Sequence, residues 1–280
     1  MKKCLNFLKA FVILLLTPLL ITQTYAANKR LHKKVKQAAT KIVQREPEDN
    51  SIESITVDCA FSIGGYCNCA RYLENNGLRR TASPIDWMRG YSLHTAAYLF
   101  ETKFKDFFTN VKVTEEKNGW KNRTVYDTKN HIESIHYMPP AIPFDQAYAE
   151  FKETMSRRAQ KIDNVLSHSK SVLLVSSRHK SHNSYVNDTD NQLKDFAQRF
   201  SKVYPNLKKI YLINMYNDNN MKTRKRIVYK DKKIKIIQYK FSDTGFSDWL
   251  GNKAAWNEIM GHIHLTDKVQ EDNGIHDTKY

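Results

Sequence analysis

Residues 54–67, SITVDCAFSIGGYC, place a predicted strand, a pair of glycines and a cysteine directly one after another. Apolar and small residues alternate over residues 54–63, and this period of two is typical of a β-strand. The two glycines end the strand and allow the backbone to approach a neighbouring segment closely. Cys67 then opens a predicted helix over residues 67–76, which Gly77 ends with a left-handed backbone conformation. The stretch therefore predicts a strand–turn–helix unit that presents a thiol at the start of its helix.

The patterns that follow this unit alternate between helices and apolar strands. Residues 170–176 (KSVLLVS) and 208–214 (KKIYLIN) are apolar runs of the kind buried in parallel sheets. Residues 227–241 predict one or two more strands, and residues 111–137 predict a hairpin. Helical patterns cover residues 93–100, 144–166, 193–203 and 249–264. This order predicts an α/β or α+β fold, in which a single domain has a central sheet flanked by helices.

The N-terminal residues have the pattern of an export signal. Residues 1–26 combine three lysines, a twelve-residue apolar run and small residues before a cleavage point at Ala27. We expect a secreted or periplasmic protein, and the alternative is an uncleaved membrane anchor. After the signal we expect a basic, polar lead-in over residues 27–53, the domain over residues 54–265 and a polar tail over residues 266–280.

The composition is that of a globular, basic protein. Of its 280 residues, 41% are hydrophobic, and 45 Lys and Arg against 29 Asp and Glu give a net charge of +16. These proportions exclude a disordered or collagen-like chain. The sequence contains no zinc finger, phosphate loop or RNA-binding aromatic signature, so nucleic acid is not the favoured partner. The densest basic run, residues 222–235, could bind an anionic polymer or a membrane surface, but its alternating isoleucines and valine favour a solvated β-hairpin.

Cysteine usage argues against both a disulfide scaffold and a metal site. Cys4 lies in the signal, so three cysteines remain, all within one short stretch. Cys59 falls in the predicted strand and is expected in the core, and Cys69 is expected to be structural. The spacing of Cys67 and Cys69 lacks the usual gap of a zinc ligand pair, and no second pair follows. We therefore expect no metal and no cofactor.

Cys67 is the candidate nucleophile. At a helix N-terminus, unpaired amides and the helix dipole favour the thiolate over the thiol, and the same amides could stabilise an oxyanion. Two alternatives remain open: Cys67 is a small buried residue at a turn, or it is disulfide-bonded to Cys59. In a third interpretation Cys67 is incidental, and the Ser62–Gly65 turn holds a phosphate or a sugar.

A nucleophilic thiol needs a base, and ten histidines compete for that role. His136 follows a β-prone stretch, where a fixed loop could present its imidazole. His179 follows the strand predicted over residues 170–176, at the carboxyl end where the sites of α/β proteins gather, and is the alternative base. Asp86 is a candidate orienting acid, and its alternative role is a hydrogen bond within its own loop.

The residues around Cys67 resemble a known family. Residues 62–67 (SIGGYC), 77–79 (GLR) and 83–87 (SPIDW) are similar to the opening signature of a bacterial family of putative papain-like cysteine peptidases, formerly a domain family of unknown function. The sequence departs from that signature at Ile85, where the family has an aromatic residue, and by its second nearby cysteine, Cys69. The later matches, at Arg157, Arg158 and two tryptophans, are looser.

This resemblance implies a papain-like fold and thiol hydrolysis. Carried over residue by residue, it makes Cys67 the nucleophile, His136 the base and Asp86 the orienting acid. We expect an exported thiol hydrolase that acts on a peptide or amide. The alternative is a non-enzymatic secreted protein that binds anionic envelope polymers or membranes through its basic face. Candidate contacts for substrate or an anion are Arg157, Arg158 and Arg178, although the first two are favoured as ion-pairing or packing residues of a helix.

Overall fold

The computed structural model describes residues 51–119, 121–177, 188–218, 222–243 and 249–266. The chain divides into two units, Met1–Pro47 and Glu48–Tyr280, and every described residue belongs to the second. The predicted signal peptide therefore lies outside the described residues, as do His179 and Arg178. Within the described part of the chain, no helix has both the length and the apolar character needed to cross a membrane.

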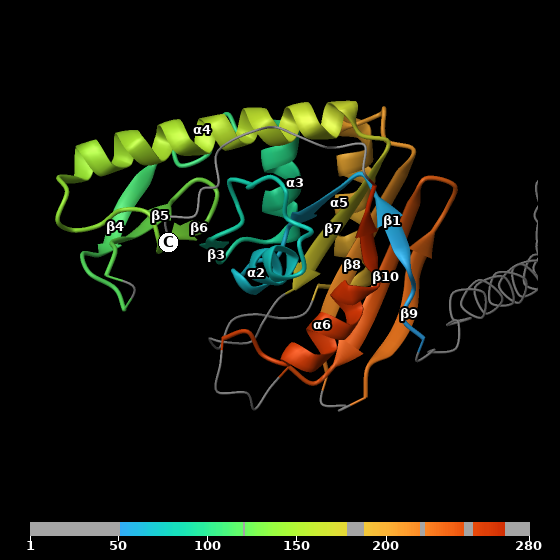
Figure 1. Cartoon of the computed structure of the whole chain (residues 1–280). Coiled ribbons are helices and arrows are strands. Elements are labelled where there is room, and N and C mark those ends of the chain that lie inside the picture. Colours follow the sequence, from blue (N-terminus) through green and yellow to red (C-terminus); the bar gives the residue numbers. More distant parts are fainter. Residues whose placement is uncertain (1–50, 120, 178–187, 219–221, 244–248, 267–280) are drawn as a thin grey trace, which may run out of the picture. The chain divides into compact units, whose positions relative to one another are not determined.

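A five-stranded sheet forms the centre of the second unit (Figure 1). Its first four strands run parallel, and the edge strand β9 is antiparallel to β10. Residues 172–175 are fully buried in the second strand, as their continuous apolar run predicts. The strand order is β2 (Cys59–Ser62), β7 (Ser171–Ser177), β8 (Lys209–Asn217), β10 (Ile234–Phe241) and β9 (Arg224–Lys230).

Helices cover both faces of this sheet. Successive residues of a strand point to opposite faces, so one strand contributes apolar side chains to two cores. Leu174 packs into one core with α3 (Leu93–Glu101), α4 (Phe144–His168) and α5 (Asp190–Val203). Leu173 and Val175 pack into a second core with α2 (Asn68–Asn75) and α6 (Lys253–Gly261). The predicted α/β domain with a central sheet flanked by helices is confirmed.

A second, antiparallel sheet carries part of the candidate site. Its strand order is β3 (Met88–Arg89), β6 (Ile132–Ser134), β5 (Thr124–Asp127) and β4 (Val111–Glu115). The hairpin predicted over residues 111–137 is thus three strands, and β3 adds a fourth. Met88 pairs with Ser134, which brings the segment after Trp87 alongside the segment that leads to His136.

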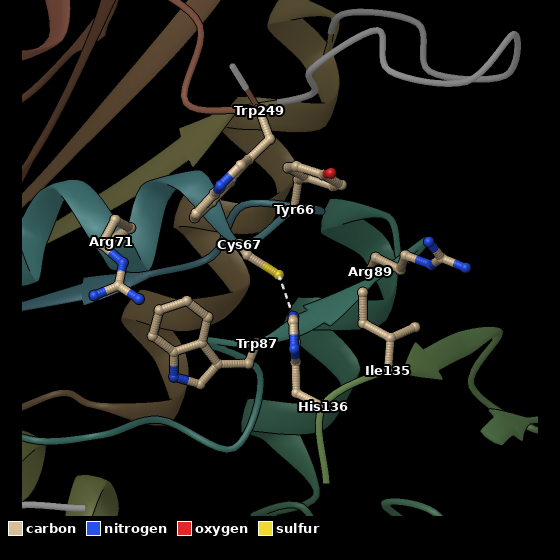
Figure 2. Close-up of a pocket in the computed structure, with 8 residues that line it drawn as sticks. All are labelled: Tyr66, Cys67, Arg71, Trp87, Arg89, Ile135, His136 and Trp249. Carbon is tan, nitrogen blue, oxygen red and sulfur yellow. Dashed lines mark hydrogen bonds between the residues drawn. The ribbon is translucent and has the colours of Figure 1, made fainter. Parts of the chain in front are cut away.

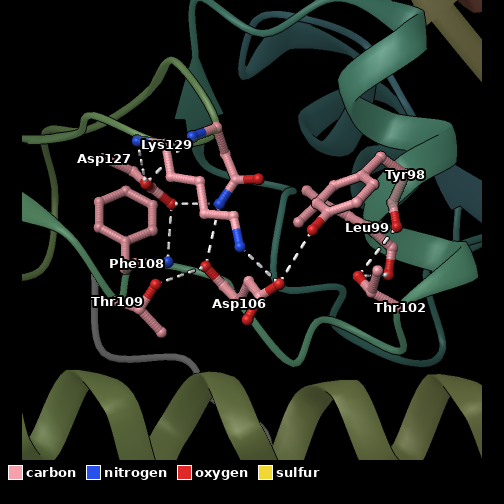
Figure 3. Close-up of polar contacts among 9 residues, drawn as sticks. Tyr98, Leu99, Thr102, Asp106, Phe108, Thr109, Asp127 and Lys129 are labelled. Atoms are coloured by element: carbon pink, nitrogen blue, oxygen red, sulfur yellow. Dashed lines mark hydrogen bonds and ion pairs between the residues drawn. The ribbon is translucent and has the colours of Figure 1, made fainter.

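Two buried or half-buried carboxylates attach this sheet to the end of α3 (Figure 3). Asp127 accepts hydrogen bonds from the Phe108 backbone N–H and the Asn130 side chain, both at 2.7 Å. Asp106 accepts from the Tyr98 hydroxyl at 2.9 Å and from the Lys129 ammonium at 2.7 Å. Because a buried carboxylate is stable only when it is hydrogen-bonded, this network fixes the position of the β5–β6 turn.

The prediction of a single strand over residues 54–63 is wrong, because this segment forms two strands. β1 (Ile55–Val57) pairs with β11 (Ile263–Leu265), whereas β2 pairs with β7 in the central sheet. Asp58 makes the break: its carboxylate accepts hydrogen bonds from the backbone N–H groups of Lys170 and Ser171 and from the Thr266 hydroxyl. The helix predicted over residues 249–264 is likewise shorter, because the chain after α6 continues as β11.

Candidate active site

The turn before Cys67 is packed tightly against the end of β7. Gly65 donates its backbone N–H to the Ser177 carbonyl at 3.2 Å. A Cβ atom on Gly64 would lie 2.5 Å from the sulfur of Cys69 and 3.3 Å from the Ser177 nitrogen, so a side chain has no room there. The close approach predicted for the glycines is confirmed. It places Cys67 at the N-cap of α2, as the sequence predicts.

The thiol of Cys67 faces the imidazole of His136 (Figure 2). The Cys67 Sγ lies 3.7 Å from the His136 Nε2. His136 comes two residues after the end of β6, and the ring of Trp87 stands edge-on to its imidazole, with centroids 6.2 Å apart and planes at 81°. Residues from three separate segments therefore bring a nucleophilic atom and a basic atom within proton-transfer reach.

The Cys67–His136 pair opens into a small pocket with a volume of about 160 Å³. Its wall combines aromatic and aliphatic side chains with two arginines, and Figure 2 shows them around the sulfur. A single side chain or acyl group fits such a space better than a polymer does. The residues that line it are Tyr66, Cys67, Arg71, Trp87, Arg89, Ile135, His136 and Trp249.

Burial raises the pKa of the Cys67 thiol to about 12. Arg89 and Arg71 act in the opposite direction, as does a hydrogen bond from the residue's own backbone, while Asp86 adds to the rise. The thiolate expected from the helix N-terminus is therefore wrong for the resting protein. Cys67 is only 4% exposed, and the cost of burying an anion exceeds the stabilisation that amides and arginines provide.

Burial also lowers the pKa of His136 to about 4, and Arg89 and Arg71 lower it further by charge repulsion. The imidazole is consequently neutral at physiological pH. A neutral thiol facing a neutral imidazole is the starting state in which the base removes the proton as the sulfur attacks, rather than a pre-formed ion pair.

Asp86 is buried, and its contacts are those of a loop anchor. Its carboxylate accepts hydrogen bonds from the Arg79 Nε at 2.7 Å and from the Ser83 backbone N–H at 2.8 Å. The sequence left two roles open for Asp86, an orienting acid or a hydrogen-bond acceptor within its own loop. These contacts favour the second role. They hold Asp86 in place, and Asp86 directly precedes Trp87. Asp86 therefore supports His136 through the indole of Trp87.

The other cysteines are separate from the pocket. Cys59, Cys67 and Cys69 are all buried and none of them forms a disulfide bond, which excludes the alternative of a Cys59–Cys67 disulfide in this structure. Cys59 makes a 3.4 Å contact with the Ser169 hydroxyl, and Cys69 packs beside Gly64. Among the residues that the structure describes, no group of three or more His, Cys, Asp and Glu side chains could hold a metal ion.

The arginines predicted on α4 do not line the pocket. Arg157 is exposed, whereas Arg158 is buried and donates to the Tyr137 hydroxyl at 2.6 Å, with its guanidinium 5.4 Å from the ring centroid. Arg158 is thus a packing residue, as favoured from the sequence. It holds the residue next to His136, so its effect on the site is indirect.

Arg71 and Arg89 are the pocket residues that the sequence analysis missed. Arg71 follows Cys67 by four positions on the same helix, and residues four apart share one helix face. That spacing alone could have identified it. Arg89 lies in the two-residue strand β3, and no sequence pattern signals its approach to Cys67.

The basic run over residues 222–235 forms β9 and the start of β10, as the hairpin interpretation predicts, and several of its charges pair with carboxylates. Arg226 contacts Asp190 at 2.6 Å, and Arg224 contacts Asp218 at 2.7 Å. Lys235 also pairs with a glutamate from outside the run. This pairing reduces the positive charge that the run presents to a polyanion.

The fold and this pocket define an α/β domain in which a thiol and an imidazole meet in an aromatic recess. The chain belongs to the family described as "Putative papain-like cysteine peptidase (DUF1796)", whose model matches residues 58–219. An uncharacterised protein, R408, of Acanthamoeba polyphaga mimivirus is 21% identical over 217 residues, which are 71% of this chain and 96% of that protein. No solved structure matches the chain. The family predicted from the sequence is confirmed, and a bacterial source stays a prediction.

Proposed function

We propose that this protein is a thiol hydrolase that cleaves a peptide or amide bond with Cys67 as nucleophile and His136 as base. The observation that carries the proposal is the 3.7 Å approach of the Cys67 Sγ to the His136 Nε2 inside a pocket. Family membership supports the same chemistry. A buried structural cysteine would need neither an imidazole partner nor an opening to a substrate.

The reaction follows from the neutral resting state. His136 removes the thiol proton while the sulfur forms a bond to the substrate carbonyl carbon, and the carbonyl oxygen becomes an oxyanion. Backbone N–H groups at the start of α2 would stabilise that charge by hydrogen bonds. When the C–N bond breaks, His136 returns its proton to the leaving amine. Water, activated by the same imidazole, then cleaves the thioester and restores the thiol.

The test uses a mixed peptide library and mass spectrometry of the products. We expect the wild-type protein to cut a subset of peptides, and Cys67→Ala and His136→Ala to lose that cleavage. Cys69→Ala is the matched control, because it removes a buried thiol two residues away and should still cut. Cleavage that survives in Cys67→Ala, or an intact library with the wild-type protein, would contradict the proposal.

Export is a second part of the proposal. Its support is the charged, apolar and small-residue order of residues 1–26, which lie outside the described part of the chain. Mass spectrometry of the protein recovered from cells and from their medium or periplasm tests it. We expect a mature N-terminus at Ala27 in the exported fraction. An intact Met1 terminus in all fractions would contradict cleavage.

A further inference from the structure

Two arginines stand in the wall of the pocket on different elements. Arg71 lies on α2, and its guanidinium sits 5.0 Å from the Trp87 ring centroid. Arg89 lies on β3, on the other side of the sulfur from Arg71 (Figure 2). Their side chains are 37% and 25% exposed, so both are partly withdrawn from water and can still be reached by a ligand.

Within the described part of the chain, each guanidinium has donors left for a ligand. Arg71 contacts Glu74 through one nitrogen at 2.7 Å, and Arg89 contacts Glu133 through Nε at 2.6 Å. An arginine side chain carries five N–H donors in a planar fork that matches a carboxylate. Neither glutamate lines the pocket, and no other carboxylate does among the residues that the structure describes. The described wall of the recess thus carries two positive side chains and no negative one.

The size of the recess limits the group that can enter. The pocket has a volume of about 160 Å³. A cavity of about 150 Å³ holds a benzene molecule, so the recess has room for a group of about five or six heavy atoms. That is the size of a glutamate side chain. Trp87, Trp249 and Tyr66 would cover its methylene carbons, while the arginines would receive its charge.

We propose that the pocket binds a carboxylate that lies next to the scissile carbonyl, so that the protein acts on acidic peptides. This inference rests on the proposed function of Cys67 as the nucleophile. Arg71 and Arg89 are then the residues that determine specificity: they place the acidic group beside the sulfur and leave the proton transfer to His136.

A pair of alkylating reagents tests the inference without a known substrate. Iodoacetate and iodoacetamide react with thiols by the same displacement of iodide and differ only in a carboxylate or an amide. We expect the ratio of their rates at Cys67, iodoacetate over iodoacetamide, to exceed the ratio for the urea-unfolded chain by about 5-fold, as one partly exposed ion pair allows. Tandem mass spectrometry separates Cys67 from Cys69.

Arginine variants connect the effect to the pocket. Arg71→Gln and Arg89→Gln should each reduce the ratio toward that of the unfolded chain, and added salt should do the same. Arg157→Gln, an exposed change on α4, is the matched control and should leave the ratio unchanged. Melting curves confirm that each variant is folded. A ratio equal to that of the unfolded chain, or one that both arginine variants leave intact, would overturn the inference.

This measurement separates the inference from the proposed function. A rate ratio cancels the intrinsic reactivity of the thiol, so a reactive Cys67 with no preference for iodoacetate refutes the acidic specificity alone. Peptide substrates then locate the carboxylate. Matched peptides with Glu or Gln before the scissile bond test an acidic side chain, and peptides with a free or amidated C-terminus test a terminal carboxylate. Equal cleavage within both pairs contradicts the inference.

Discussion

Trp87 stands edge-on to His136 and has two guanidinium groups near its own ring. The His136 centroid lies 6.2 Å away, and the guanidinium carbons of Arg71 and Arg79 lie 5.0 and 5.7 Å from the indole centroid. Arg79 in turn pairs with the buried Asp86. A single aromatic side chain therefore connects the ion pairs of one loop to the imidazole of another segment.

Trp87→Leu should reduce hydrolysis more than it reduces stability. The leucine cannot hold His136 by an edge contact, and a displacement of about 1 Å at a reacting group costs roughly 100-fold in rate. We expect kcat/KM to fall by roughly 10- to 100-fold and Trp87→Phe to retain more activity. Trp256→Phe is the control, because Trp256 stacks on Tyr72 in the other core and should affect the melting temperature alone. Full activity in Trp87→Leu would refute the connection.

The acid limit of activity should lie near pH 4. The pKa of His136 is lowered from 6.5 to about 4, so the imidazole stays neutral and able to accept a proton until the pH approaches that value. We expect kcat/KM to stay constant down to about pH 5 and to fall below it. A decline centred near pH 6.5 would show that burial does not perturb the imidazole.

The same shift makes the folded state less stable in acid. Between pH 6.5 and about 4 the unfolded chain binds a proton at His136 that the folded chain does not, so the free energy of unfolding falls as the pH falls through that window. The loss is at most about 3 kcal/mol, because the ring is partly exposed. Urea unfolding at pH 7 and pH 4.5 should show a smaller difference for His136→Gln than for the wild type.

Gly64→Ala should destabilise the protein by about 1–3 kcal/mol, the usual cost of overpacking. The added Cβ would lie 2.5 Å from the Cys69 Sγ and 3.3 Å from the Ser177 backbone nitrogen. Adding Cys69→Ala removes the closest of these atoms, so the double variant should recover part of the loss in chemical denaturation. Gly261→Ala, where nothing lies within 4 Å of the new carbon, should be neutral or slightly stabilising. An equal cost at both glycines would contradict the explanation.

Asp58→Ala should cost about 2–4 kcal/mol, because it removes the acceptor of several hydrogen bonds to one charged group. Burial raises the pKa of this carboxyl, but hydrogen bonds from Lys170, Thr266 and Ser171 lower it more, and the net pKa is below 3.8. The stabilisation is therefore present above pH 3.8 and is lost as the pH falls below it. The difference from the wild type, measured by urea unfolding, should shrink at pH 2–3. A constant difference would show that the charge of Asp58 is not involved.

Local patterns predicted the elements that carry most of the buried surface. The continuous apolar run in β7 and the glycines before Cys67 are strong local signals, so the central strands and the start of α2 were predictable. The break at Asp58 was not, because one polar residue in an alternating run does not reveal that its carboxylate binds a backbone segment more than a hundred residues away. The strand β3 is too short for any periodicity.

The residues of the candidate site also fall into those that local sequence predicts and those that depend on distant contacts. Cys67 and His136 could be selected from local context and from the family signature, and the structure brings them together. The protonation state of the thiol could not be predicted, since the helix N-terminus is visible in the sequence and the burial that opposes it is not. Arg89 depends on the pairing of Met88 with Ser134, a contact between segments that no spacing rule describes.

The pairing of β1 with β11 determines when this domain can finish folding during its synthesis. Ile55 pairs with Ile263, so β1 leaves the ribosome long before the strand that pairs with it. Until residue 265 has been synthesised, the edges of β1 and the apolar face beneath it have no partner in that sheet. A chain stalled or cut before this point carries an exposed strand edge, which is a site for aggregation or for recognition by a chaperone. The folded state of this domain therefore requires that β11 has been synthesised.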